Sequence, residues 1–446
     1  MFKTQLRPPQ LSSRRAGSPN AAPKTATRWL RPALATLTTL MLGAAALAPT
    51  SPAQAGVFSK DPNGDVARPF YYNSATLDGT PGKLLRQEAA VSGINTLGIS
   101  KIGPYKAQRI LYSSKNRTGK NIAVSGIVIE PKRAWSGKGQ RPIIAYAPGT
   151  QGISDDCAPS WNIANSIGDY EQLFFKSFLA KGYAVVVTDY EGLGTPGAHT
   201  YMDRVSQGHA VLDSARAATQ LKGWDLGKNN PIVINGYSQG GGAAASAAEL
   251  AGTYAPELNI KGAAAGAVPA NLSALPAKLD GGKSALFELY ALKGLTTSYG
   301  VTLPLSPHGQ QVMQRATNTC VMGGSFYSGT RLSQLTSDGT NVNQLMTQEP
   351  YRTMLAEQRI GNLKPTMPVL LTHGRGDDVI DYQVGSTLAS DWCARGARVT
   401  FTPNDAKSHT AGASEHLKQS LVFTMLVLDG LSPNSCSARY SPGPAR

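Results

Sequence analysis

The chain has 446 residues and a formal net charge of +15, with 43 Lys and Arg against 28 Asp and Glu. Seven of the basic residues and none of the acidic ones fall in the first 55 residues, so the remaining 391 residues carry only about +8. Charges spread this thinly argue against a nucleic-acid-binding protein. A hydrophobic content of 41% with 47 Gly and 29 Pro excludes collagen, coiled coil and wholesale disorder, and indicates a turn-rich globular chain with a large core.

The first 55 residues have the order of a secretory signal peptide. Arg28 and Arg31 precede an apolar run at 33–48, which is followed by the small-residue cleavage pattern Ala53, Gln54, Ala55. The run has 16 mostly small residues, whereas a membrane-spanning helix needs roughly 20. We therefore expect cleavage after Ala55, a secreted or periplasmic protein, and no integral membrane segment after removal of the signal.

The chain contains four cysteines, at positions 157, 320, 393 and 436. In an exported protein an even number of cysteines favours disulfides, and no two of them have the CxxC spacing of a zinc site. No metal or other cofactor is expected. Three pairings are possible. The most local one joins Cys393 to Cys436 and Cys157 to Cys320, but spacing alone leaves the choice open.

Two β-like runs, 105–113 and 122–129, are joined by turn residues around 115–120. From residue 142 on, the pattern changes to short continuous apolar runs at 143–147, 183–190, 231–235, 260–268, 369–372 and 398–401, with helices expected at 170–180, 205–221 and 241–251. Continuous rather than alternating apolarity is typical of parallel strands buried on both faces by helices. The pattern predicts an α/β fold with a mostly parallel sheet covered by helices on both faces.

The interval 268–369 interrupts this rhythm. It is about 100 residues long, far beyond an ordinary connection between two strands. An apolar stripe within it, formed by Leu286, Phe287, Leu289, Tyr290, Leu292 and Leu295, favours a folded, largely helical cap. We expect this cap to span 273–365, with a mobile polar stretch at 333–343, between core segments 56–272 and 366–446.

The strongest chemical motif is GxSxG at residues 236–240. It follows the predicted strand 231–235 directly and opens a helix of small residues. This strand, tight turn and helix form the nucleophile elbow of serine hydrolases, in which the glycines allow a strained turn and close backbone approach. Ser238 is therefore the candidate nucleophile.

A serine nucleophile needs a base and an orienting carboxylate, which follow it in the chain in the order acid, then histidine. Asp377 comes just after the predicted strand 369–372, and Asp378 is its rival. Of the six histidines, only His409 lies in the loop expected after the last strand, before a helix whose Leu417, Leu421, Met425 and Leu428 should face the core. The other five are expected to be surface or packing histidines.

The oxyanion formed during serine attack requires preformed N–H donors. One should be the backbone amide of Gln239, directly after the nucleophile. The other should come from the loop 148–152, which follows the strand 143–147, with Thr150 as the first choice and Gln151 as the alternate.

Together these motifs resemble the secretory lipase family of yeasts and bacteria, the lipase A type of α/β-hydrolase. The resemblance covers about 61–431, and the matching segments are PGTQG at 148–152 leading to CAPS at 157–160, DYEG at 189–192, GYSQG at 236–240, and GRGD at 374–377 with His409. It implies Ser238, Asp377 and His409 as triad, a cap before the acid-bearing strand, and the local disulfide pairing.

The resemblance further implies an exported serine hydrolase that cleaves carboxylic esters through an acyl-enzyme. The expected substrates are small-molecule or lipid esters, in particular acylglycerols, with contact to a lipid interface through the cap. Two alternatives stay open: a peptidase or acyltransferase on the same scaffold, and a non-catalytic envelope or binding protein that kept the fold.

Overall fold

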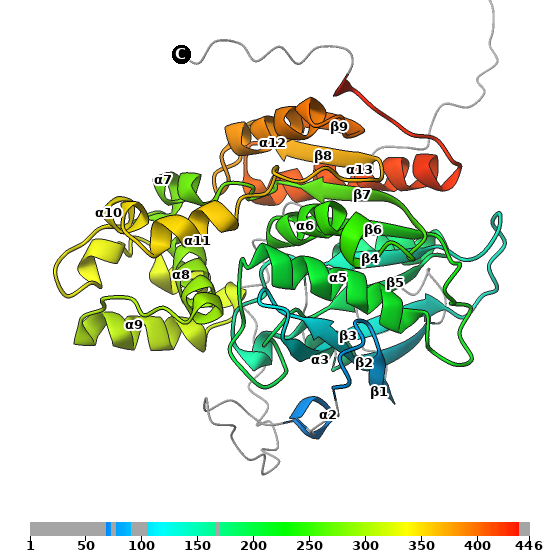
Figure 1. Cartoon of the computed structure of the whole chain (residues 1–446), viewed down its shortest axis with the longest axis horizontal. Helices are drawn as coiled ribbons and strands as arrows, with labels where there is room; N and C mark the ends of the chain where they lie inside the picture. The colour runs from blue at the N-terminus through cyan, green and yellow to red at the C-terminus, as the bar shows by residue number, and fades with distance from the viewer. Residues whose placement is uncertain (1–67, 73–76, 91–104, 166–169, 437–446) are drawn as a thin grey trace, which may run out of the picture. The chain divides into compact units, whose positions relative to one another are not determined.

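The computed structural model describes residues 68–72, 77–90, 105–165 and 170–436. All of them belong to one compact unit, Phe58–Arg446 (Figure 1). The predicted signal peptide and its cleavage site lie outside the described residues. Within the described part of the chain, none of the helices is long and apolar enough to cross a membrane.

The centre of the molecule is a nine-stranded sheet in the order β1-β2-β3-β5-β4-β6-β7-β8-β9. Strands β1 to β3 pair antiparallel, β3 pairs antiparallel with β5, and the pairs from β5 to β9 are parallel. The strands are β1 Leu84–Ala89, β2 Tyr105–Lys115, β3 Asn121–Pro131, β4 Ile143–Ala147, β5 Ala184–Thr188, β6 Ile232–Tyr237, β7 Ile260–Gly266, β8 Val369–Gly374 and β9 Val399–Asn404. The sequence missed β1, a half-exposed edge strand without an apolar run.

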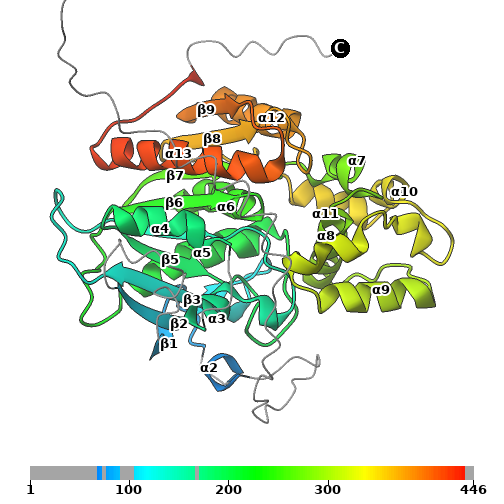
Figure 2. The ribbon, with the colours of Figure 1, turned by 180° about the vertical axis from the view of Figure 1, so that it is seen from behind.

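Helices cover both faces of the sheet, which explains the continuous apolar runs. Successive strand residues contribute to different cores: Ile234 packs with α5 (Arg204–Ala218), α6 (Gln239–Tyr254) and α12 (Tyr382–Ala394), whereas Val233 packs with α4 (Gln172–Ala180) and α13 (His409–Leu428). Helices α5 and α6 lie in front of the sheet in Figure 1, and α4 and α13 in Figure 2. The short elements α2 Pro69–Tyr72, η3 Asp155–Cys157 and α3 Pro159–Ala164 complete this part.

The expected core face of the last helix needs correction. Met425 is exposed, and Leu417, Leu421 and Leu428 are only partly buried. The fully buried face carries smaller and polar residues as well as large ones: His416, Ser420, Phe423, Thr424 and Val427. Leu417, Leu421 and Leu428 nevertheless pack against the core as predicted, so only Met425 departs from the expected face.

The segment between β7 and β8 is built mainly of helices. Its elements are η4 Leu272–Ala274, α7 Pro276–Leu279, α8 Ala285–Tyr299, α9 Pro307–Thr317, η5 Val321–Tyr327, η6 Leu332–Gln334, α10 Val342–Thr347 and α11 Tyr351–Glu357. The stretch 333–343, for which mobility was expected, is packed in part. Leu335 and Thr336 are buried there, and the Leu335 carbonyl accepts the Ser306 N–H at 2.8 Å, because this stretch packs against the start of α9.

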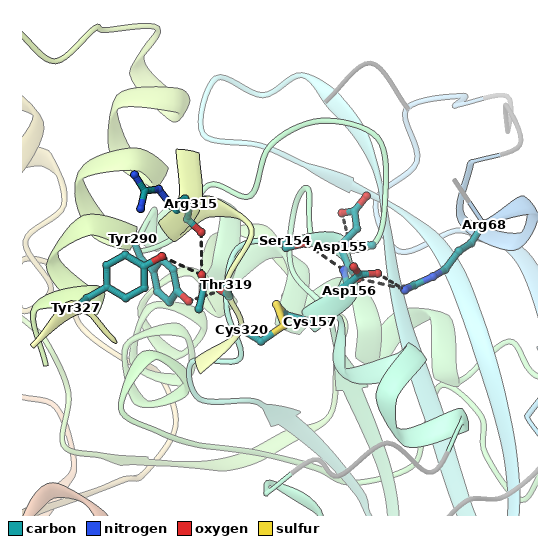
Figure 3. Close-up of a disulfide and its surroundings, with 11 residues drawn as sticks. Arg68, Ser154, Asp155, Asp156, Cys157, Tyr290, Arg315, Thr319, Cys320 and Tyr327 are labelled. Carbon is teal, nitrogen blue, oxygen red and sulfur yellow. Dashed lines mark hydrogen bonds and ion pairs between the residues drawn. A yellow bond between two sulfur atoms is a disulfide. The ribbon is translucent and has the colours of Figure 1, made fainter. Parts of the chain in front are cut away.

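Two disulfides connect the cysteines. Cys157 is joined to Cys320 and Cys393 to Cys436, and the described residues include no free cysteine. The first bond ties the loop after β4 to the residue that precedes η5, in the segment between β7 and β8 (Figure 3). The second ties α12 to the chain after α13.

Candidate active site

Ser238 occupies a strained turn between β6 and α6. Its φ of 62° and ψ of −122° lie in a region that non-glycine residues rarely adopt, which is typical of functional turns. The flanking glycines are required by close backbone approach. A Cβ on Gly236 would lie 2.2 Å from the Gly240 carbonyl oxygen, and one on Gly240 would lie 2.0 Å from the Ala147 oxygen. The predicted elbow geometry is therefore present, and Ser238 is partly exposed at its tip.

A continuous chain of hydrogen bonds joins the predicted triad residues. His409 Nε2 lies 2.8 Å from Ser238 Oγ, and His409 Nδ1 lies 2.8 Å from Asp377 Oδ2. Asp377 is buried and accepts the Val379 and Ile380 N–H groups through its other oxygen. Burial raises the pKa of Asp377, but the hydrogen bonds and the charge of His409 lower it by more, so the pKa lies below its ordinary value. An ionised Asp377 can hold the Nδ1–H tautomer of His409 and leave Nε2 free to accept the serine proton.

His409 is the first residue of α13, not a loop residue as expected. Ser408 caps the helix through the Ala411 N–H, and Asp378 Oδ1 accepts the His409 backbone N–H at 2.8 Å. The two adjacent carboxylates thus bind different atoms of the same histidine. Asp377 contacts the ring and Asp378 holds the backbone.

The other histidines have different partners. His199 is buried, and burial lowers its pKa to about 4, so the ring is neutral. Its Nδ1–H donates to the Glu191 carbonyl at 2.7 Å, and its Nε2 lies 3.3 Å from Gln239 Nε2, from which it can accept. The ring hydrogen bonds of the others join His209 to Lys115 O, His373 to Ile380 O and His416 to Thr372 Oγ1, while His308 is exposed. None of these rings is bonded to Ser238.

The loop after β4 lies against the nucleophile, as expected for an oxyanion loop. A Cβ on Gly149 would lie 3.4 Å from the Tyr237 carbonyl oxygen, next to Ser238. The Gly149 N–H is occupied, because it donates to Glu171 Oε1 at 2.6 Å. No acceptor among the described residues is bonded to the N–H of Thr150, nor to that of Gln239 at the start of α6.

Side chains that the sequence did not indicate hold this loop. Glu171 binds Gly149, and the hydroxyl of Tyr146 donates to the same carboxyl group. Tyr170 donates to the Thr150 carbonyl at 3.0 Å, and Tyr190 donates to the Pro148 carbonyl at 2.8 Å. Burial raises the pKa of Glu171 to about 7, against the opposite effect of its hydrogen bonds. None of these residues belongs to a recognisable motif except Tyr190, in DYEG, so only their convergence in space reveals them.

The apolar stripe of the segment between β7 and β8 faces mainly the interior of that segment. Leu286, Leu289 and Tyr290 are buried in a hydrophobic core there. Leu295 lines a cavity of about 70 Å³ between α7, α8, α10 and α11. Ser238, Asp377 and His409 do not line this cavity, so it is separate from the reacting groups.

Comparison with known proteins shows similarity to lipases. The family model described as secretory lipase matches residues 161–424. A secreted triacylglycerol lipase of Malassezia furfur is 28% identical over 378 residues, covering 79% of this chain and 75% of the relative. A probable inactive lipase of Mycobacterium tuberculosis is 29% identical over 349 residues, covering 75% of each chain.

A solved structure shares the fold. Candida antarctica lipase A in its closed state superposes with a TM-score of 0.71 at 23% identity, covering 85% of this chain and 89% of that chain. This likeness confirms the predicted α/β-hydrolase fold. With the family model matched over more than half of its length, the chain belongs to the secretory lipase family and is a carboxylic ester hydrolase.

Proposed function

We propose that this protein cleaves lipid esters through the triad Ser238, Asp377 and His409. The observation that carries the proposal is the unbroken hydrogen-bond chain from Ser238 Oγ through His409 to Asp377. His409 Nε2 takes the hydroxyl proton as Ser238 attacks the ester carbonyl, and then gives that proton to the departing alcohol. Water activated by the same nitrogen hydrolyses the acyl-enzyme and releases the acid.

The backbone amides of Gln239 and Thr150 are the proposed oxyanion donors. Both N–H groups lack an acceptor among the described residues, whereas the Gly149 N–H is already bonded to Glu171. Donors that are fixed before the reaction stabilise the developing charge without reorganising. Gln151 remains the alternate to Thr150, since its N–H likewise has no bonded acceptor in the described part of the chain.

The substrate class follows from the relatives. Several of them are named secreted triacylglycerol lipases, so acylglycerols are the proposed substrates. The segment 273–365 is the proposed cap, which contacts the lipid interface. Residues 1–55 are the proposed signal peptide, cleaved after Ala55 to release a secreted or periplasmic enzyme.

A non-catalytic protein is the second candidate, because one relative is named a probable inactive lipase. The complete chain of hydrogen bonds argues against it, since binding alone needs neither the strained Ser238 nor its aligned base. A peptidase or acyltransferase would use the same triad with a different leaving group or acceptor. Hydrolysis of a matched anilide tests for peptidase activity, and acyl transfer to a competing alcohol tests for acyltransferase activity.

The decisive experiment labels the nucleophile with a fluorophosphonate and locates the adduct. A single adduct on Ser238 supports the proposal, and an adduct elsewhere refutes it. The Ser238→Ala variant should fold normally and lose about 10³- to 10⁶-fold in kcat on p-nitrophenyl esters. Unimpaired hydrolysis by this variant would exclude Ser238 as the nucleophile.

A further inference from the structure

Two apolar side chains protrude from the cap segment η5. Met322 is 84% exposed and Phe326 is 89% exposed, which makes them the most exposed large hydrophobic residues of the described chain. They lie four positions apart on the same short helix, η5. Removing large apolar side chains from water lowers the free energy. Two such side chains left exposed on one short helix therefore indicate a surface that binds something apolar.

The protrusion is not a loosely held loop. Tyr327, directly after Phe326, turns inward and its hydroxyl lies 3.0 Å from Thr319 Oγ1, while Tyr290 donates to the Thr319 carbonyl (Figure 3). After η5, the Thr330 carbonyl accepts the Gly281 N–H at 2.8 Å. The segment is therefore fixed at both ends, and its backbone presents Met322 and Phe326 outward.

The base of η5 is attached directly to the proposed oxyanion loop. The Val321 N–H donates to the Gln151 carbonyl at 2.8 Å, next to Thr150. Cys320 pairs with Gly152 and forms the disulfide with Cys157 (Figure 3). A surface that receives Met322 and Phe326 would consequently come to lie beside the loop that binds the ester carbonyl.

The charge pattern around the pair fits a lipid surface. Residues 316–330 contain no Asp, Glu, Lys, Arg or His, and Arg315 and Arg331 flank this uncharged segment. Both arginines are exposed. The guanidinium of Arg331 lies 3.8 Å from the carboxylate of Asp280, whereas Arg315 can reach polar headgroups while the apolar side chains enter the lipid. A protein partner is less suitable, because two such side chains offer roughly 400 Å², against about 800 Å² per partner in a stable protein interface.

We propose that Met322 and Phe326 insert into the lipid–water interface of aggregated ester substrate and dock the enzyme with its oxyanion loop next to the lipid. The inference rests on the proposed function only in explaining why docking beside the oxyanion loop helps the enzyme, since insertion into lipid itself needs no catalysis. It names the part of the cap that makes the interface contact.

The test separates binding from hydrolysis. Binding is measured by flotation with triolein droplets stabilised by phosphatidylcholine, in a Ser238→Ala background so that the droplets stay intact. The variant Met322→Ser/Phe326→Ser should lower the partition coefficient roughly 10- to 100-fold. The matched control Val422→Ser/Leu431→Ser removes two side chains that are 52% and 55% exposed near the end of α13, away from the cap (Figures 1 and 2). This control should bind within about 2-fold of the parent.

The same substitutions in the chain with native Ser238 should leave hydrolysis of soluble p-nitrophenyl acetate within about 2-fold of the parent, which also shows that the variant folds. Unchanged flotation of Met322→Ser/Phe326→Ser would overturn the inference. So would a change in self-association on analytical ultracentrifugation without a change in flotation, because the pair would then serve a protein contact. Absence of soluble-ester hydrolysis in the native chain would instead refute the proposed function and leave the flotation result standing.

Discussion

Replacing Glu171 by glutamine tests how the oxyanion loop is held and what this arrangement costs in stability. The carboxyl group is fully buried, and its pKa rises from the ordinary value of 4.5 to about 7, mainly because burial disfavours the charge. An acid whose pKa is raised in the folded state stabilises the fold below its unfolded pKa and loses that contribution as the pH rises through the folded pKa. For Glu171 the window runs from about pH 4.5 to about pH 7.

The magnitude follows from the two pKa values. A difference of this size corresponds to about 3 kcal/mol of unfolding free energy lost between pH 4 and pH 8. Glutamine does not titrate, and its Oε1 can still accept the Gly149 N–H while its amide meets the Tyr146 hydroxyl, which can rotate to accept. The Glu171→Gln variant should therefore gain stability relative to the native protein as the pH rises, whatever constant offset the substitution brings.

Urea unfolding at several pH values between 4 and 8 measures this difference. The stability of Glu171→Gln minus that of the native protein should increase by about 3 kcal/mol across the range. Other titrating groups, including Asp377 with its lowered pKa, cancel in the subtraction. A difference independent of pH would refute the reasoning, because Glu171 would then titrate alike in the folded and unfolded chain.

Three further predictions concern the triad, the disulfides and the substrate. Asp377→Asn should reduce kcat by about 10⁴-fold, because the wrong tautomer of His409 is favoured. Asp378→Asn should have a mild effect, because the amide oxygen of asparagine still accepts the His409 backbone N–H. Steady-state kinetics measure both variants, and the reverse ranking would assign the catalytic acid to Asp378. Replacing both Cys157 and Cys320 by serine removes a disulfide that links residues 163 positions apart. Because the disulfide limits the conformational entropy of the unfolded chain, its loss should lower the free energy of unfolding by about 5 kcal/mol, as measured by urea unfolding. A loss below about 1 kcal/mol would contradict this entropic explanation. Hydrolysis rates from C2 to C18 acyl chains, with and without an emulsified interface, should rise with chain length at the interface, and a steady fall beyond C4 without interfacial gain would indicate an esterase.

The sequence determined the local features of this protein. Continuous apolar runs predicted the parallel strands, since residues that face both helical layers must all be apolar. The elbow at 236–240 was recognisable because only glycine fits at two of its positions: a Cβ placed on Gly236 or Gly240 would lie 2.2 or 2.0 Å from a backbone oxygen. The chain order of Ser238, Asp377 and His409 followed from the order of strand ends, at which such side chains converge.

Only the tertiary structure decided which distant side chains meet. Glu171 binds Gly149 across 22 positions, and Asp378 reaches the His409 backbone across 31, although neither contact leaves a periodic trace in the sequence. The edge strand β1 is formed by pairing with β2 and not by its own apolar pattern. The exposure of Met322 and Phe326 likewise depends on which neighbours turn inward. Local patterns record the environment on each side of a strand or helix, whereas contacts between loops depend on how the assembled sheet brings their ends together.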